Sequence, residues 1–157
     1  MAAEKQKTGK PVIKEDEVCV CFNLRKAARV ITQIYDDVMR PIGYRATQVT
    51  LLGVIVNYSP ITVKQLANVI DTDPTTLLRN LRVLEKEKLL SLDPGEDKRS
   101  RIVALTDKGR SVLATAYPLW KATQDKIAAR VGRENLNQLL GNLNIALNSI
   151  HDLTVKS

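Results

Sequence analysis

Polar side chains that suit the edges of base pairs gather in one short segment, residues 75–82. An arginine guanidinium can donate two hydrogen bonds to guanine, an asparagine amide can pair in the same way with adenine, and a threonine hydroxyl reaches a phosphate or a base edge. The alternative is a solvated helix face, because the outer face of an amphipathic helix is ordinarily polar. The residues concerned are Thr75, Thr76, Arg79, Asn80 and Arg82.

A second charged group lies in segment 93–100, which reads Asp-Pro-Gly-Glu-Asp-Lys-Arg-Ser. It joins two short apolar runs at 89–92 and 101–105, and its Pro-Gly pair is a turn signal, so the sequence predicts a β-hairpin with a projecting loop. A guanidinium at such a tip fits the negative potential of a DNA minor groove, or the phosphate backbone. The candidate residues are Asp97, Lys98, Arg99 and Arg101.

The elements that must position these residues are helices. A capping box, Thr62-Val-Lys-Gln65, starts one of them, and Asp73 followed by Pro74 starts the next. Thr106 is expected to cap a later helix, which must bend or break near Pro118. Apolar residues recurring every three or four positions predict helices over about 16–39, 46–57, 62–70, 74–88, 107–131 and 133–153.

The order of these elements predicts the fold class. Two short helices joined by a tight turn, followed at once by a basic hairpin, are typical of a winged helix-turn-helix. We therefore expect a mainly α protein with a small β-hairpin wing, in which a flexible tail (1–14) precedes one domain (15–157). The winged helix-turn-helix should span about 46–106, flanked by dimerisation helices at about 16–39 and 107–153.

The composition favours a polyanionic partner. The 24 Lys and Arg exceed the 17 Asp and Glu, and aromatic residues make up only 4% of the chain, too few to supply stacking platforms for single strands. Double-stranded DNA is the expected partner, and the alternative is a winged-helix protein-interaction module.

The sequence gives little support to other classes of function. No catalytic constellation or cofactor motif is visible, so we expect neither enzyme activity nor a cofactor. The sequence also has no apolar run long enough for a membrane span and no secretory signal, so we expect a cytoplasmic protein.

Three segments resemble the recognition helix and wing of the MarR (multiple antibiotic resistance) regulators, and the likeness extends over roughly residues 17–150. The resemblance implies a triangular homodimer with interlocking terminal helices and one wing per subunit. We expect such a dimer to read a pseudopalindromic operator and to act as a repressor. The segments are Pro74-Thr-Thr-Leu-Leu-Arg-Asn-Leu-Arg-Val-Leu-Glu85, Asp97-Lys-Arg-Ser100 and Val103-Ala-Leu-Thr-Asp-Lys-Gly109.

The same resemblance implies roles for single residues. Arg79 would read the major groove and Arg99 the minor groove, while Asp97 would orient the wing by pairing with a nearby arginine. Thr75, Thr76 and Arg82 would be supporting contacts. Lys88 stands where the family usually has glycine, so we expect it either to adopt a positive φ or to reshape the turn that leads into the wing.

Segment 17–24, Glu-Val-Cys-Val-Cys-Phe-Asn-Leu, also resembles the start of the organic hydroperoxide regulators of that family. The resemblance implies that Cys21 is a peroxide-reactive thiol and that Tyr35 is one of its tyrosine partners. Arg25 and Ala46 stand where two further partner tyrosines would be expected. The alternative is that the cysteines pack in the core, where cysteine is common.

Cys19 and Cys21 lie two residues apart, so a helix would point them to opposite sides. We therefore expect no disulfide between them and no metal site, since two such thiols and a single histidine do not complete a ligand set.

The long terminal helices have broad apolar faces, which we expect to be buried across a two-fold axis in a homodimer. The sequence leaves two candidates for the signal that releases the protein from DNA, an oxidant and a small aromatic molecule. Tyr44 and Tyr117 are candidate residues of a cleft for the aromatic molecule.

Overall fold

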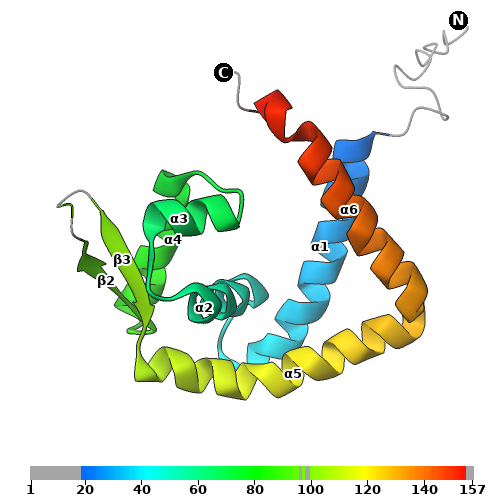
Figure 1. The fold of residues 1–157 in the computed structure, drawn as a ribbon. Coiled ribbons are helices and arrows are strands. Elements are labelled where there is room, and N and C mark those ends of the chain that lie inside the picture. The colour runs from blue at the N-terminus through cyan, green and yellow to red at the C-terminus, as the bar shows by residue number, and fades with distance from the viewer. Residues whose placement is uncertain (1–18, 96, 98–99, 155–157) are drawn as a thin grey trace, which may run out of the picture.

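The structure is a computed structural model that describes residues 19–95, 97 and 100–154, with side chains described up to residue 150. The predicted tail at 1–14 lies outside the described residues. Figure 1 shows a small winged domain at one end of a long helix, α5 (Asp107–Val131), and α6 (Arg133–Thr154) rising from its other end. The helix α1 (Val20–Met39) rises from α5 between them and continues into a short 3-10 turn, η1 (Arg40–Ile42).

The winged domain combines three helices with a small antiparallel sheet in the strand order β1-β3-β2. Val103 of the middle strand lies opposite both Ile61 and Leu92, and its side chain is fully buried. The elements are α2 (Ala46–Tyr58), β1 (Ile61–Thr62), α3 (Val63–Val69), α4 (Pro74–Lys86), β2 (Leu90–Pro94) and β3 (Arg101–Leu105). This is the mainly α, winged helix-turn-helix fold that the sequence predicts.

Apolar side chains from every element of the winged domain form one core. The apolar period of α4 predicts that Leu77, Leu81 and Leu84 form one buried stripe, and the structure confirms it, because these leucines are at most 2% exposed. They pack in one cluster with α2, α3 and the sheet, whose main contributors are Leu52, Ile55, Leu66, Leu89, Leu90 and Val103. The stripe therefore fixes how α4 is rotated about its own axis.

A second, smaller cluster joins α1 and α5 to the winged domain. Met39, Val49 and Ala116 meet there, and all three are buried. The Asp36 carboxylate of α1 also accepts a hydrogen bond from the backbone N–H of Ala46, 2.7 Å away, at the start of α2. The winged domain is thus attached to α1 by both apolar and polar contacts.

The helix boundaries largely follow the sequence signals. Thr106 caps α5 through a hydrogen bond of 3.1 Å from the N–H of Gly109, and Gly132 ends that helix with φ 88°. At Pro118 the helix is continuous rather than broken, and Figure 1 shows it as a curved rod. The strand β1 was not predicted, because a strand of two residues carries no periodic pattern.

The apolar faces of α1 and α6 are largely exposed. Leu24 and Ile31 of α1 are 45% and 43% exposed, and Leu140 and Leu147 of α6 are 52% and 53% exposed. Among the described residues, no helix is long and apolar enough to cross a membrane.

The end of α4 is a Schellman motif with a lysine at the position that favours glycine. Lys88 has φ 61°, and the N–H of the next residue, Leu89, bonds the Leu84 carbonyl at 3.0 Å. The N–H of Lys88 bonds the Glu85 carbonyl at 2.8 Å. The helix consequently ends at Lys86, two residues before the predicted end, and of the two outcomes expected for Lys88 the structure has the positive φ.

Lys88→Gly should raise the free energy of unfolding by about 0.5–1 kcal/mol, because glycine relieves the left-handed strain although it adds entropy to the unfolded chain. Urea denaturation at a fixed protein concentration measures this change. Lys86→Gly, within the helix, is the control and should lower the stability. Equal or lower stability for Lys88→Gly would contradict the strain argument.

Candidate nucleic-acid interface

The two short helices of the winged domain begin at side-chain caps that the sequence predicts. Thr62 and Gln65 form the capping box of α3, since each side chain bonds the other residue's backbone N–H, at 3.2 Å and 3.0 Å. At α4 the Asp73 carboxylate accepts the N–H of Thr76 at 2.8 Å, and Pro74 occupies the first turn. The capping box fixes where α3 begins, and the Asp73 cap begins α4 directly after the tight turn between the two helices.

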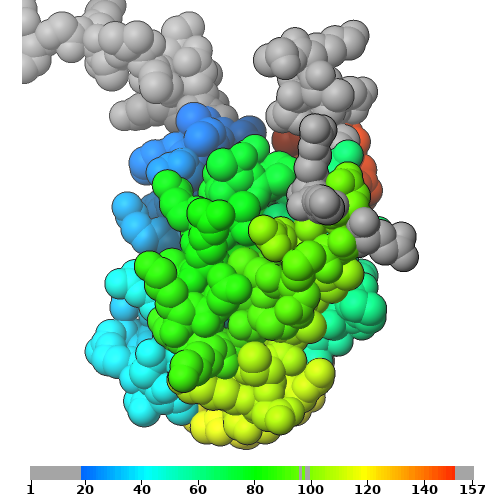
Figure 2. All heavy atoms as spheres, turned by 90° about the vertical axis from the view of Figure 1, so that its left-hand side faces the viewer, coloured from blue at the N-terminus to red at the C-terminus, as the bar shows by residue number. Residues whose placement is uncertain are grey.

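The outer face of α4 is polar and basic. Thr75, Arg79, Arg82 and Lys86 follow the spacing of one helix face, opposite the leucine stripe, and all four are exposed. Figure 2 looks onto this side of the molecule, with α3 and α4 in green in the middle and the hairpin beside them. Among the described residues, none of the three basic side chains forms an ion pair. Their charges therefore face solvent.

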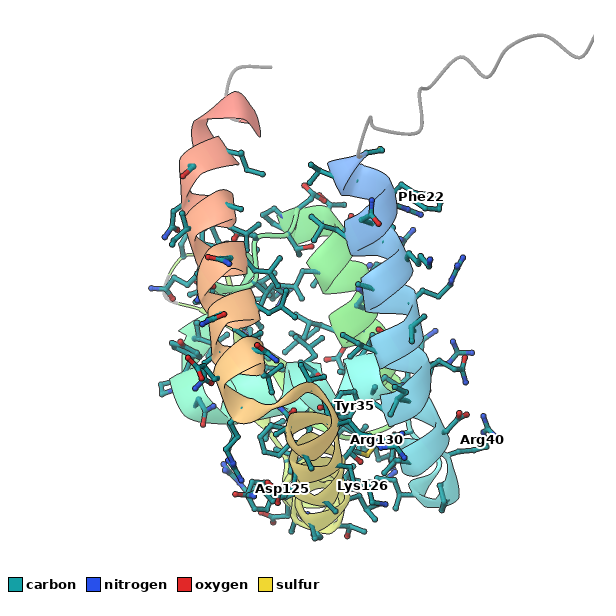
Figure 3. All side chains as sticks on the ribbon, turned by 90° about the vertical axis from the view of Figure 1, so that its right-hand side faces the viewer. Phe22, Tyr35, Arg40, Asp125, Lys126 and Arg130 are labelled. Atoms are coloured by element: carbon teal, nitrogen blue, oxygen red, sulfur yellow. The ribbon has the colours of Figure 1, made fainter. Side chains whose placement is uncertain are left out.

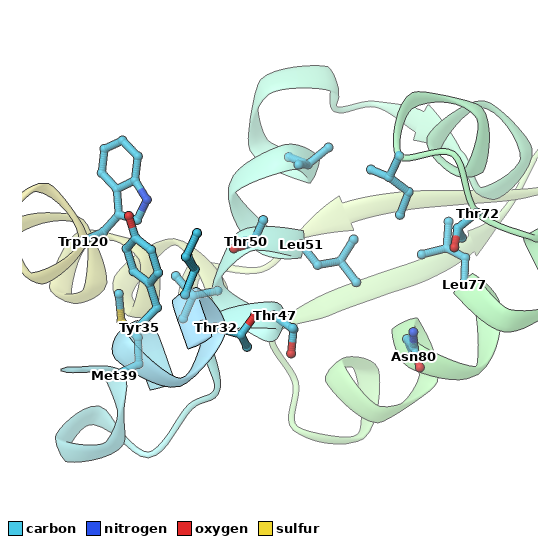
Figure 4. A pocket seen from close by; sticks show the side chains of 15 residues that line it. Thr32, Tyr35, Met39, Thr47, Thr50, Leu51, Thr72, Leu77, Asn80 and Trp120 are labelled. Atoms are coloured by element: carbon cyan, nitrogen blue, oxygen red, sulfur yellow. The ribbon is translucent and has the colours of Figure 1, made fainter. Parts of the chain in front are cut away.

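Two predicted residues of α4 lie beside that face rather than on it. Thr76 is exposed and its N–H is held by the Asp73 cap. Asn80 lines a cleft between α4, α2 and α1, as Figure 4 shows, together with Thr47 and Leu77. Asn80 thus stands where the helix face and the cleft meet.

The wing is built on β2 and β3. Arg101, the first residue of β3, is exposed, and Pro94 pairs with it across the hairpin. In the turn, the carbonyl of Asp97 accepts both the N–H and the hydroxyl of Ser100, each at 2.8 Å. Lys98 and Arg99 lie outside the described residues, so the role of Arg99 stays a prediction, as does the pairing of Asp97 with a nearby arginine.

Lys86 was not singled out from the sequence, although it continues the polar face in the last turn of α4. The signal was present, because Lys86 follows Arg82 by four residues and Arg79 by seven. It extends the basic face toward the base of the wing.

Two clefts adjoin the interface. The first, of about 330 Å³, lies between α1, α2 and α4 and is lined by Tyr35 and Asn80 (Figure 4). The second, of about 640 Å³, lies between α2 and α5 and is lined by Tyr117 and Arg110. Trp120 lines both. Tyr44, the other tyrosine predicted for a cleft, lines neither of these two but borders two other clefts, of about 400 Å³ and 190 Å³, and also packs against the core.

The clefts combine aromatic rings with a tyrosine hydroxyl that can form hydrogen bonds. Burial raises the pKa of the Tyr35 phenol, so the hydroxyl stays protonated at neutral pH and can donate a hydrogen bond. Tyr117 and Trp120 stack with ring centroids 5.8 Å apart. Apolar walls with a few polar groups are typical of small-molecule sites.

The two cysteines lie at the first turn of α1. Cys19 is the helix cap, and its Sγ accepts the N–H of Phe22 at 3.4 Å, while Phe22 projects from the helix in Figure 3. Cys19 and Cys21 are both free and exposed, so neither packs into the core of this chain.

Tyr35 lies fourteen residues after Cys21 in one continuous helix, about 21 Å along its axis. The structure therefore does not bring these two residues together within one chain. The described residues contain no group of three side chains that could hold a metal ion.

Comparisons with known proteins agree with this geometry. No protein-family model matches the sequence. The transcriptional regulator MosR of M. tuberculosis, solved in complex with DNA, is 37% identical, and the match covers 84% of this chain and 98% of MosR with a TM-score of 0.75. The HTH-type regulator MgrA of Staphylococcus aureus is 26% identical over 129 residues, which cover 78% of this chain and 85% of MgrA. The regulator YwoH of Bacillus subtilis is 26% identical over 83 residues, 53% of this chain and 61% of YwoH.

The fold and the outward basic face of α4 define a winged helix-turn-helix protein in which α4 is the second helix of the motif, the one that serves as recognition helix in DNA-binding proteins of this class. The likeness to MosR identifies the family as well as the class, because the match spans nearly all of MosR at 37% identity. The chain belongs to the MarR family of transcriptional regulators.

Proposed function

We propose that this chain is a sequence-specific regulator of transcription that binds double-stranded DNA as a homodimer in the cytoplasm. It represses its target genes until a small molecule or an oxidant releases it. The observation that carries the proposal is the outward face of α4, on which Arg79, Arg82 and Lys86 are exposed beside the wing. The DNA complex of MosR, a relative of this chain, supports it.

The dimensions of α4 suit a major groove. Its thirteen residues make a rod about 20 Å long, and a helix of ordinary diameter fits the groove, which is about 12 Å wide. Arg79 lies near the middle of the outer face, where it can pair with a guanine. Arg82 and Lys86 lie toward the end that leads to the wing, where they can contact phosphates.

Arg79→Ala should weaken binding to the operator by about 1–3 kcal/mol and relax the sequence preference at one position of each half-site. Binding to random DNA should change much less, because Arg79 is assigned to a base. Titration of operator and random duplexes over a salt series measures both losses.

Arg130→Ala is the matched control for Arg79→Ala, since Arg130 is exposed near the far end of α5 (Figure 3). It should leave both affinities unchanged. Equal losses for Arg79→Ala on the two duplexes would reassign Arg79 to the phosphates. Absence of any preference for the promoter region in the wild-type protein would favour the interaction-module alternative.

The exposed apolar faces of α1 and α6 support the homodimer. Both helices rise from the same side of α5 and stand apart from each other (Figure 3). A second copy related by a two-fold axis would cover both faces with the same pair of helices. Such a dimer would also present two copies of α4 to two half-sites about one helical turn apart, as a pseudopalindrome requires.

Leu140→Glu should dissociate the dimer, because a carboxylate would replace an apolar side chain at the centre of the α6 stripe. Sedimentation equilibrium should show at least about a tenfold rise in the dimer dissociation constant, which corresponds to about 1.4 kcal/mol. Gln138→Glu, on the opposite face of α6, should leave the dimer intact. A dimer unaffected by Leu140→Glu would contradict the assignment of this face.

A small aromatic acid suits the larger cleft. Its ring would stack on Tyr117 and Trp120, and its carboxylate would pair with Arg110, which lines the same cleft. Gly53 also lines it, and a Cβ at this position would meet nothing within 4 Å. A larger side chain there would fill the cleft without disturbing the core.

An oxidant would act at α1 instead. The Cys21 thiolate would attack one oxygen of an organic hydroperoxide, which would yield a cysteine sulfenic acid and release the alcohol. Because Cys21 is exposed in the chain, a hydroperoxide can reach it. Tyr35 could assist only if it came from the second copy, given its distance along α1.

One experiment separates the two signals. The operator complex is exposed either to 4-hydroxybenzoate or to cumene hydroperoxide, and the fluorescence of Trp120, the single tryptophan, reports binding in the cleft. Release by the acid should be lost in Gly53→Leu, whereas release by the hydroperoxide should be lost in Cys21→Ser and kept in Cys19→Ser. A complex that survives both reagents would contradict both assigned signals.

A further inference from the structure

The chain that leaves the recognition helix is held by three hydrogen bonds to the start of α5. Three consecutive carbonyl groups follow α4, those of Glu87, Lys88 and Leu89, and each accepts a donor from α5 or its cap. The ammonium of Lys108 reaches the first at 2.8 Å, the hydroxyl of Thr106 reaches the second at 2.7 Å, and the N–H of Thr106 reaches the third at 3.1 Å. We call these three bonds the carbonyl clamp.

A close backbone approach accompanies the clamp. A Cβ built on Gly109 would lie 2.0 Å from the carbonyl oxygen of Leu89, so no other residue fits there without separating the two segments. Gly109 is buried, and its N–H is the donor that the Thr106 hydroxyl accepts. Thr106 therefore serves two segments at once, since its hydroxyl caps α5 and also donates to Lys88.

The clamp joins two elements that apolar packing alone would leave free to tilt. Leu84 and Leu89 are buried and hold the end of α4 in the core, but apolar contacts have little directional preference. Hydrogen bonds to three successive carbonyls fix the direction in which the chain leaves the helix. Through α5 the same bonds connect the recognition helix to α6.

We propose that Thr106, Lys108 and Gly109 are positioning residues for DNA recognition, which set the tilt of α4 through the carbonyl clamp. The proposal rests on the proposed DNA-binding function. Base reading by a side chain such as Arg79 needs a fixed helix geometry, whereas contacts to phosphates tolerate small displacements. Loosening the clamp should accordingly cost operator affinity more than affinity for random DNA.

Thr106→Val tests the clamp, because it keeps the shape of the side chain and removes the hydroxyl. We expect about a tenfold loss of operator affinity and at most about a twofold loss on random DNA. Hydrogen exchange of the peptide spanning residues 84–92 should accelerate in the same variant without any DNA present. Thr106→Ser should restore both properties, since it returns the hydroxyl.

Thr115→Val is the control, because among the described residues the Thr115 hydroxyl bonds only the Ser111 carbonyl of its own helix. Lys108→Met is a second variant that removes one clamp bond and leaves the cap of α5 in place, and it should show the same loss of preference to a smaller extent. Lys108→Met tests the clamp even if the Thr106→Val protein does not fold.

The outcomes are distinct. A folded Thr106→Val protein with wild-type exchange and wild-type preference for the operator would overturn the clamp. So would a loss on both duplexes alike that Thr106→Ser does not restore. If the wild-type protein itself shows no operator preference, the proposed function fails, and the exchange rates alone then decide whether the clamp exists.

Discussion

Burial of Leu77, Leu81 and Leu84 decides which side of α4 meets solvent. Full burial of one leucine contributes about 1.5–3 kcal/mol, so three of them contribute an amount comparable with the net stability of a whole domain. Rotating α4 by one residue would expose leucines and bury an arginine without a partner, which is costly. The outward position of Arg79 and Arg82 is therefore a consequence of the core, and the chemistry of the face depends on it.

Polar contacts add the direction that apolar packing lacks. Asp73 fixes where α4 begins, Lys88 in the left-handed region fixes where it ends, and Thr106 ties that end to α5. Each contact contributes only about 1 kcal/mol, but together they determine the angle at which the recognition helix is presented. None of these contacts buries the exposed apolar faces of α1 and α6. The proposed second copy of the chain would cover them.

Much of the fold could be predicted from the sequence because its signals are local. The capping box at Thr62, the Asp73-Pro74 start and the hairpin turn each depend on a few adjacent residues, and the leucine stripe depends only on the helix period. At Lys88 the family resemblance indicated a special backbone position, but a lysine there could adopt a positive φ or reshape the turn, and only the structure decides between them.

The rest depends on contacts between segments far apart in the sequence. Whether Asn80 faces DNA or a cleft is decided by the position of α2, and the pairing of β1 is decided by β3. The approach of Gly109 to Leu89 needs the end of α4 and the start of α5 in one place. The exposure of Cys19 and Cys21 likewise reflects what packs against α1, which no pattern within α1 reveals.

The central claim is that α4 of each subunit reads the major groove of two half-sites. Methylation of guanine N7 by dimethyl sulfate tests it most directly, because this atom lies in the major groove. With the wild-type protein bound to its promoter region, we predict two clusters of protected guanines, centred about 10–11 base pairs apart. Saturated, tight binding without protection of any guanine N7 in a guanine-containing site would contradict the claim.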